Sequence, residues 1–327
     1  MKKNKLIKIL CFIVVGIIIG VAGIFIFNKL KPNNSNKTEE VQKEKITPLL
    51  FEVTKDNSNN KMYLFGSIHV ANINNIEFPK YVIDAYNNSH YLACEFDIIK
   101  YKKEQKVEEE IMNLMYQDGT TIKDHLDKKT YDKLVEFLTK KNMYSEIYEV
   151  YKPVFFESLL SMQSSIDANI DTNQGVDDYF ISKATNDKKN ILEVESANFQ
   201  LELSNSFPDK LYSLMFSELI DNYDEDVETL KDLYQAWKDG DKDKLTKIIN
   251  DDMKVNNGYS KDDIKLIENY YKKMNDDRNK EMLKKAIEYF NSNQDVFFMV
   301  GTAHIISDSG LVNSLEKEGF TVKQITK

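Results

Sequence analysis

The chain carries one short pattern twice, a glycine followed three residues later by a histidine, at Gly66–His69 and at Gly301–His304. Each copy lies in a nearly all-apolar segment, residues 62–70 and 296–306, which predicts a strand buried on both faces. Two such strands side by side would bring two histidines to one edge of a sheet. The chain has four histidines in all, so we interpret the matched pair as a site rather than as two unrelated core residues.

Small residues accompany both histidines. Gly66 and Gly301 remove a side chain where strand backbones or a ligand approach closely. Ser67 and Thr302 each supply a hydroxyl that could orient a ligand or the backbone turn. Either of them could equally be an ordinary small residue at the end of a strand.

Two other apolar segments carry carboxylates. Glu95 lies inside the segment 91–97, Asp97 ends it, and Glu193 lies inside the segment 191–194. An unpaired charge in an apolar strand is costly, so Glu95 and Glu193 are candidate site residues. Asp97 could belong to the site or could cap the helix that follows.

Two neutral imidazoles with one or two carboxylates suit a divalent metal such as Mn, Co or Zn, with positions left for water. We expect His69, His304 and Glu95 as ligands, while Glu95 and Glu193 both remain candidates for ligand or general base. The metal would lower the pKa of bound water to about 7 and polarise a carbonyl, which predicts hydrolysis of an amide or ester. Neither an HExxH helix nor a GxSxG elbow occurs, which excludes a standard zincin and weakens a serine-hydrolase interpretation.

The pattern of elements predicts an α/β fold with a central mixed or mostly parallel sheet that bears both histidine strands. A large helical insertion is expected in two segments, around residues 100–180 and 208–291, where apolar residues recur at helical spacing. The predicted strands are residues 49–54, 62–70, 91–97, 191–194, 296–306 and 320–325, and shorter helices are expected at 78–87 and 311–318.

Composition narrows the class of protein. The 327 residues are 42% hydrophobic and 30% charged, which indicates a globular protein. The net charge is −9, and outside the extreme N-terminus the sequence has no long basic run that could bind nucleic acid. We therefore expect no nucleic-acid partner. Of the two cysteines, Cys11 lies in the N-terminal apolar segment and Cys94 in a predicted strand. The globular part therefore has a single cysteine and cannot form a disulfide bond within itself.

The N-terminus predicts a membrane anchor. An uncharged apolar run at residues 9–27, preceded by four lysines, is long enough to cross a hydrocarbon core of about 30 Å. The denser lysine cluster lies before the run, which favours a cytoplasmic N-terminus and a domain outside the cytoplasm. We expect an anchor at 1–30, a flexible polar linker at 31–46 and the α/β domain at 47–327; the alternative is secretion after signal-peptide cleavage.

Taken together, the motifs resemble the TraB/PrgY/GumN family, to which the metal-dependent Tiki peptidases are related. The resemblance covers residues 61–327. It rests on the order and spacing of several short motifs: Gly66–His69, Glu95–Asp97, Gly175–Asp177, Leu192–Gln200, Trp237–Asp241, Arg278–Asn279, Gly301–His304 and Gly310. Two departures are Ser67, where Thr is usual, and Ser307, where Gly commonly follows the second histidine.

The resemblance implies a membrane-associated or secreted α/β protein with a metallopeptidase site that acts on small signalling peptides or protein ligands. It makes His69, Glu95 and His304 the leading site residues, with Glu193 and Arg278 in support and Arg278 steadying a substrate carboxylate or oxyanion. Further substrate-binding or supporting positions carried over from the family motifs are Gly66, Ser67, Asp97, Asp177, Asn279, Gly301 and Thr302.

The leading hypothesis is therefore a membrane-anchored, metal-dependent hydrolase, a peptidase in particular, with a peptide or protein substrate. Two alternatives remain open: a binding protein that sequesters a peptide without turnover, and a non-peptide esterase or amidase on the same scaffold. The sequence sets neither the metal nor the oligomeric state.

Overall fold

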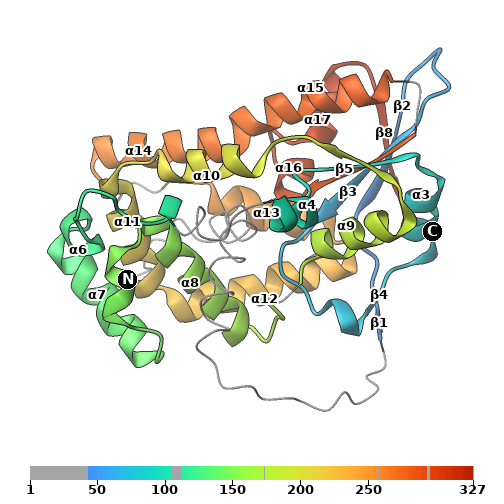
Figure 1. Ribbon diagram of the computed structural model, residues 1–327. Coiled ribbons are helices and arrows are strands. Elements are labelled where there is room, and N and C mark those ends of the chain that lie inside the picture. Colours follow the sequence, from blue (N-terminus) through green and yellow to red (C-terminus); the bar gives the residue numbers. More distant parts are fainter. Residues whose placement is uncertain (1–42, 105–111, 173, 256–257, 293–294, 327) are drawn as a thin grey trace.

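The computed structural model describes residues 43–104, 112–172, 174–255, 258–292 and 295–326. Two groups of strands lie in this part of the chain. The strands are β1 (Glu44–Lys45), β2 (Leu50–Thr54), β3 (Met62–Ser67), β4 (Ile76–Glu77), β5 (Tyr91–Cys94), β6 (Asn190–Glu193), β7 (Val296–Gly301) and β8 (Thr321–Ile325). Six of them form the main sheet in the order β6-β5-β7-β3-β2-β8, and β1 pairs with β4 (Figure 1).

The main sheet is mixed, as the sequence predicts. β6, β5, β7 and β3 run parallel to one another, whereas β2 is antiparallel to both β3 and β8. β7 is buried at every position, which explains its uninterrupted apolar sequence. The two histidine segments are therefore neighbours in the sheet: Met62 pairs with Val296 and Ser67 pairs with Gly301.

Helices make up most of the remaining described chain. The α-helices are α3 (Lys80–Asn88), α4 (Ile98–Glu104), α6 (Ile122–His125), α7 (Lys128–Lys140), α8 (Pro153–Asp167), α9 (Val176–Asp187), α10 (Ala197–Asn205), α11 (Asp209–Asp221), α12 (Tyr223–Asp239), α13 (Lys242–Asp252), α14 (Lys261–Tyr271), α15 (Arg278–Phe290), α16 (Thr302–Ile306) and α17 (Leu311–Lys317). Two 3-10 turns, η1 (Ile73–Asn75) and η2 (Glu146–Val150), and a π-helical turn, η3 (Lys272–Asp277), complete the set.

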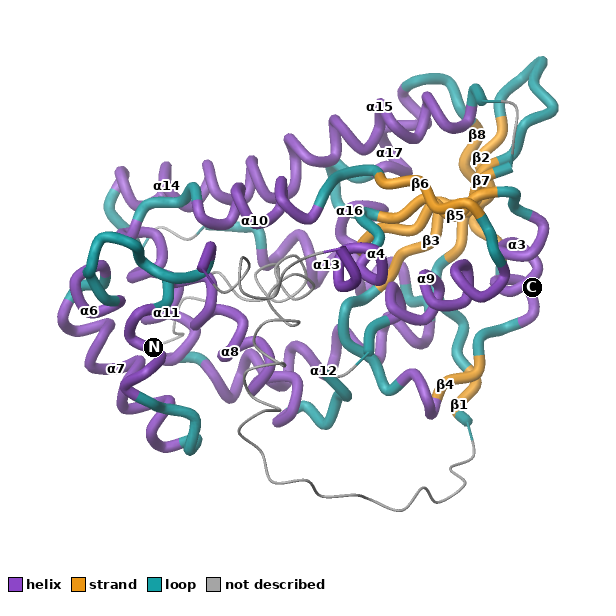
Figure 2. Tube along the Cα trace, viewed as in Figure 1, coloured by secondary structure: helices purple, strands orange, loops and turns teal. Residues whose placement is uncertain are grey.

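The sheet lies at one end of the molecule and a helical lobe at the other. α3 and α9 lie on one side of the sheet and α15 and α17 on the other (Figures 1 and 2). α6, α7, α8, α11 and α14 build the lobe away from the strands (Figure 2). α14, η3 and α15 follow one another without a break, so this long helical stretch connects the lobe to the sheet.

Several predicted boundaries need correction. The histidine strands are shorter than expected, because β3 ends at Ser67 and β7 ends at Gly301. His304 lies in the short helix α16, not in a strand, and His69 follows β3 in a loop. At the end of the β3–β7 pairing the Thr302 hydroxyl donates a hydrogen bond to the Ser67 carbonyl (2.9 Å), so this carbonyl has a partner although the ladder stops.

The predicted membrane anchor at 1–30 and most of the predicted linker lie outside the described residues. Within the described part, Glu44–Lys45 form β1 and Ile46 is buried, so the packed domain includes the end of the segment that the sequence assigns to the linker. No helix in residues 43–326 that the structure describes is long and apolar enough to cross a bilayer.

Candidate functional site

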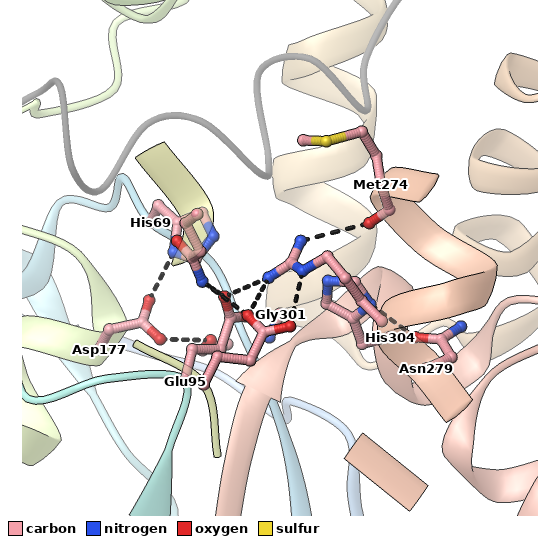
Figure 3. Close-up of polar contacts among 11 residues, drawn as sticks. His69, Glu95, Asp177, Met274, Asn279, Gly301 and His304 are labelled. Atoms are coloured by element: carbon pink, nitrogen blue, oxygen red, sulfur yellow. Dashed lines mark hydrogen bonds and ion pairs between the residues drawn. The ribbon is translucent and has the colours of Figure 1, made fainter. Parts of the chain in front are cut away.

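Parallel pairing of β3 and β7 brings both histidines to the carboxyl edge of the sheet. Ser67 and Gly301 are paired, and the two rings follow two and three residues later. His69 lies on one side of Glu95 with Asp177, and His304 lies on the other side with Asn279 (Figure 3). The predicted meeting of the two motifs with Glu95 at one edge is thus present in the fold.

Asp177 fixes the His69 ring. Its Oδ2 lies 3.0 Å from His69 Nδ1, and its Oδ1 accepts a hydrogen bond of 2.7 Å from the Ser67 hydroxyl. Because a carboxylate only accepts, Nδ1 carries the proton, and Nε2 is left without a hydrogen bond within the described part of the chain. Asp177 also lies in the first turn of α9, where the helix dipole stabilises a negative charge.

The His69–Asp177 pair is buried and charged. Burial acts to lower the pKa of His69, but the charge of Asp177 and its hydrogen bond outweigh burial and raise it. Burial acts to raise the pKa of Asp177, but the His69 charge and the hydrogen bonds from His69 and Ser67 lower it. Both shifts favour an imidazolium–carboxylate pair in the metal-free protein.

Gly175 allows α9 to approach His69. The Val176 N–H donates to the Ile68 carbonyl at 2.9 Å, which ties the start of α9 to the residue before the histidine. A Cβ on Gly175 would lie 2.3 Å from the His69 carbonyl oxygen and 2.6 Å from its carbon. Since both atoms are backbone, only glycine permits this contact without displacing the histidine.

Asn279 fixes the His304 ring from the long helical stretch. Its Oδ1 lies 2.6 Å from His304 Nδ1, while its Nδ2 donates to the Ser309 carbonyl at 3.2 Å. That carbonyl can only accept, so the amide orientation is set, and His304 must carry its proton on Nδ1. Burial and then the positive charge of Arg278 lower the pKa of His304 well below its usual value, which keeps this ring neutral.

A buried ion-pair cluster lies between the two rings. Arg278 donates to Glu95 at 2.9 Å and, through two nitrogens, to Glu195 at 2.7 and 2.8 Å. Gln200 Nε2 donates to both carboxylates, at 2.8 and 2.9 Å, and the Gly301 N–H donates to Glu95 Oε1 at 2.9 Å. The side chains of Arg278, Glu95 and Glu195 are 1%, 3% and 4% exposed, so solvent does not screen them.

The buried cluster has more acidic than basic groups. The two carboxylates of Glu95 and Glu195 share the single guanidinium of Arg278, so the cluster holds one acidic group more than basic groups. The His69–Asp177 pair beside them is neutral when the histidine is protonated. A buried surplus charge is costly, so a further cation at this point would be stabilising.

The small residues of the two motifs lock the sheet edge. A Cβ on Gly66 would lie 2.8 Å from Thr302 Oγ1, so the glycine lets β3 and α16 approach. The Gly66 carbonyl accepts a hydrogen bond of 2.9 Å from the indole N–H of Trp237, which is fully buried. The Thr302 hydroxyl donates to the Ser67 carbonyl, whereas the Ser67 hydroxyl donates to Asp177, so Thr302 contacts the backbone at the end of β3 and Ser67 orients the carboxylate that holds His69.

Two predicted residues lie outside the cluster. Glu193 is exposed, contrary to the buried position expected from its apolar neighbours, because β6 is an edge strand. Its Oε1 accepts from the Asp97 N–H at 3.0 Å, and Lys100 lies 3.7 Å away. Asp97 caps α4, since its Oδ1 accepts from the N–H groups of Ile99 and Lys100 at 3.0 and 2.9 Å.

Two residues of the cluster were missed. Glu195 was overlooked because it follows the apolar segment, where a carboxylate suggests an exposed turn. Its backbone N–H donates to the Glu95 carbonyl at 2.8 Å, an extension of the β5–β6 ladder that carries it to the site. Gln200 lies on α10 within a family motif but had no assigned role. Arg278, which was expected to steady a substrate carboxylate or oxyanion, contacts the carboxylates of Glu95 and Glu195 and donates to the Met274 carbonyl.

The fit of these residues to a metal depends on Glu95. The Nε2 atoms of the two imidazoles make no hydrogen bond within the described residues and can bind a metal once His69 is deprotonated, and a nearby carboxylate is a suitable third donor. However, no group of three or more His, Cys, Asp or Glu in the described residues is arranged to hold an ion. The residues therefore include the types of donor atom that a divalent metal binds, but Glu95 would have to leave Arg278 in order to bind the metal.

The fold and this edge define an α/β protein with a mixed sheet and a paired-histidine, carboxylate-rich site. The model of the TraB/PrgY/gumN family matches residues 49–324, and the chain belongs to that family. The residues that carried the resemblance lie mainly around the site described above. Searches of the curated proteins and of the solved structures find no match.

Proposed function

We propose that the chain is a metal-dependent hydrolase, specifically a peptidase that cleaves a peptide or protein substrate outside the cytoplasm. The observation that carries the proposal is the pair of imidazole rings at one sheet edge, each oriented through Nδ1 so that Nε2 is left for a ligand. Membership of the family and the surplus of buried carboxylates support it.

His69, His304 and Glu95 would hold the metal. When bound, the metal would supply an activated water and polarise the scissile carbonyl. Asp177 keeps the proton of His69 on Nδ1, and Asn279 does the same for His304, so both rings present the nitrogen that a metal needs. His304 is neutral already, whereas the charge of Asp177 raises the pKa of His69, so His69 must lose its Nε2 proton before that nitrogen can bind a metal.

The N-terminal segment supports a membrane location. Its apolar run at residues 9–27 and the lysines before it are those of an anchor that leaves the following domain outside the cytoplasm. This arrangement would expose the site to extracellular or periplasmic peptides. Recovery of the chain in the membrane fraction, with the domain digested by protease added to intact cells, would support this part of the proposal; recovery as a soluble cytoplasmic chain would contradict it.

The test uses the full-length chain in detergent with a mixture of peptides, and mass spectrometry detects the products. We expect cleavage that stops after metal removal, returns with added Mn²⁺, Co²⁺ or Zn²⁺, and is absent in His69→Ala and His304→Ala. His90→Ala is the matched control, because that histidine is exposed and has no part in the cluster. Cleavage by metal-free wild-type protein would refute the proposal.

A second candidate has specific support. Arg278 donates hydrogen bonds to both Glu95 and Glu195, as a member of a purely structural network would do. This favours a protein that binds and sequesters a peptide. Peptide binding without product, unchanged by a chelator, would establish it, whereas cleavage of esters but not peptides would indicate the esterase alternative.

A further inference from the structure

We propose that Glu195 is a positioning residue that holds Arg278 when Glu95 turns to the metal, so that Arg278 and the metal compete for Glu95. The inference rests on the proposed function and extends it to a residue that is not itself a ligand. It explains why the described residues contain the donors of a metal site but no completed three-residue group.

The contacts of Arg278 with its two carboxylates are unequal. Glu195 receives two hydrogen bonds, from Nε to Oε1 at 2.8 Å and from Nη2 to Oε2 at 2.7 Å. Glu95 receives one, from Nη2 to Oε2 at 2.9 Å. A two-point guanidinium–carboxylate contact is the stronger of the two, so Arg278 stays with Glu195 when one partner leaves.

The donors on Glu95 Oε2 have a second acceptor. Arg278 Nη2 and Gln200 Nε2 both contact Glu95 Oε2, and both also donate to Glu195 Oε2. Neither nitrogen loses its last hydrogen bond when Oε2 leaves. Glu95 Oε1 meanwhile remains available to the Gly301 N–H, so the carboxylate can rotate about a fixed point.

Charge also favours the exchange. In the present arrangement one guanidinium serves two carboxylates. After the exchange Arg278 is matched to Glu195, and the charge of Glu95 is available to a cation. Without Glu195, Arg278 would have Glu95 as its sole carboxylate partner in the cluster and would compete with the metal more strongly.

The experiment measures binding of Mn²⁺, Co²⁺ and Zn²⁺ to the metal-free full-length chain by calorimetry. We expect Glu195→Gln to weaken binding by about 10- to 100-fold, the usual effect of losing a residue that orients a metal ligand. Glu202→Gln is the matched control: it removes one exposed carboxylate from the helix that carries Gln200, and its affinity should equal that of the wild type. Circular dichroism checks that each variant is folded.

Arg278→Gln is a second variant that tests the same inference, also in the case that Glu195→Gln does not fold. Arg278→Gln removes the competing cation, so we expect it to bind metal roughly tenfold tighter than the wild type and to gain more thermal stability from the metal. Equal affinity in Glu195→Gln and wild type, or weaker binding in Arg278→Gln, would overturn the inference while leaving the metal site intact. Failure of the wild type to bind any of the three metals would instead refute the proposed function and the inference with it.

Discussion

Gly175→Ala should move His69 and damage the site without altering any ligand. The new Cβ would lie 2.3 Å from the His69 carbonyl oxygen, about 1 Å inside ordinary contact, and backbone atoms cannot rotate away. Forced separation costs about 1–3 kcal/mol by overpacking, and loss of the Val176–Ile68 hydrogen bond adds about 1 kcal/mol. We therefore expect a loss of about 3 kcal/mol in the free energy of unfolding.

Urea unfolding of the full-length chain measures this loss, and calorimetry with Mn²⁺, Co²⁺ and Zn²⁺ measures the effect on metal binding. A displacement of about 1 Å can cost roughly 100-fold in activity where geometry matters, so peptide cleavage should fall by a similar factor. Gly119→Ala is the control: it adds a methyl group in open space at φ +82° and should cost about 1 kcal/mol with unchanged metal affinity. Equal losses of stability in the two variants would refute the proposed role of the contact.

Three further predictions follow from individual contacts. The pKa of buried His304 is lowered in the folded protein, so His304 stays neutral where the unfolded chain takes up a proton, below pH 6.5. The free energy of unfolding of the wild type should therefore fall relative to that of His304→Gln, by up to about 1.4 kcal/mol per pH unit, as the pH drops below 6.5. If urea unfolding shows the same pH dependence for both proteins, the prediction is wrong. Asp97→Ala should lower the free energy of unfolding by about 1 kcal/mol, because it removes the N-terminal cap of α4, and should leave metal affinity unchanged. A large loss of metal affinity would show that Asp97 belongs to the site. Trp237→Phe should lower the free energy of unfolding by about 1–3 kcal/mol, because it removes the hydrogen bond to the buried Gly66 carbonyl. If the variant unfolds at the same temperature as the wild type, this hydrogen bond does not contribute to stability.

The sequence predicted the sheet edge because its signals are local. Uninterrupted apolar runs marked β3 and β7, and the matched Gly and His positions indicated that these strands are neighbours, which the parallel pairing confirms. The burial of Glu95 followed from the same reasoning.

The remaining features depend on contacts between distant segments. Glu193 and Glu195 are two residues apart, but Glu193 ends the edge strand β6 and is exposed, whereas Glu195 lies beyond the end of β6 and contacts the buried Arg278. Where β7 ends at Gly301, the Thr302 hydroxyl donates to the carbonyl of Ser67, a residue far away in the chain. Periodicity within one segment carries no information about either contact.

The metal content of the purified full-length chain tests the central claim most directly. Elemental analysis should find a divalent metal bound to the wild type and to His90→Ala, and little or none in His69→Ala, His304→Ala or Glu95→Gln. Retention of metal with loss of cleavage in Glu95→Gln alone would make Glu95 the general base. Equal metal content in the wild type and in both site-histidine variants, or none in the wild type after incubation with Mn²⁺, Co²⁺ and Zn²⁺, would contradict a metal site at this sheet edge.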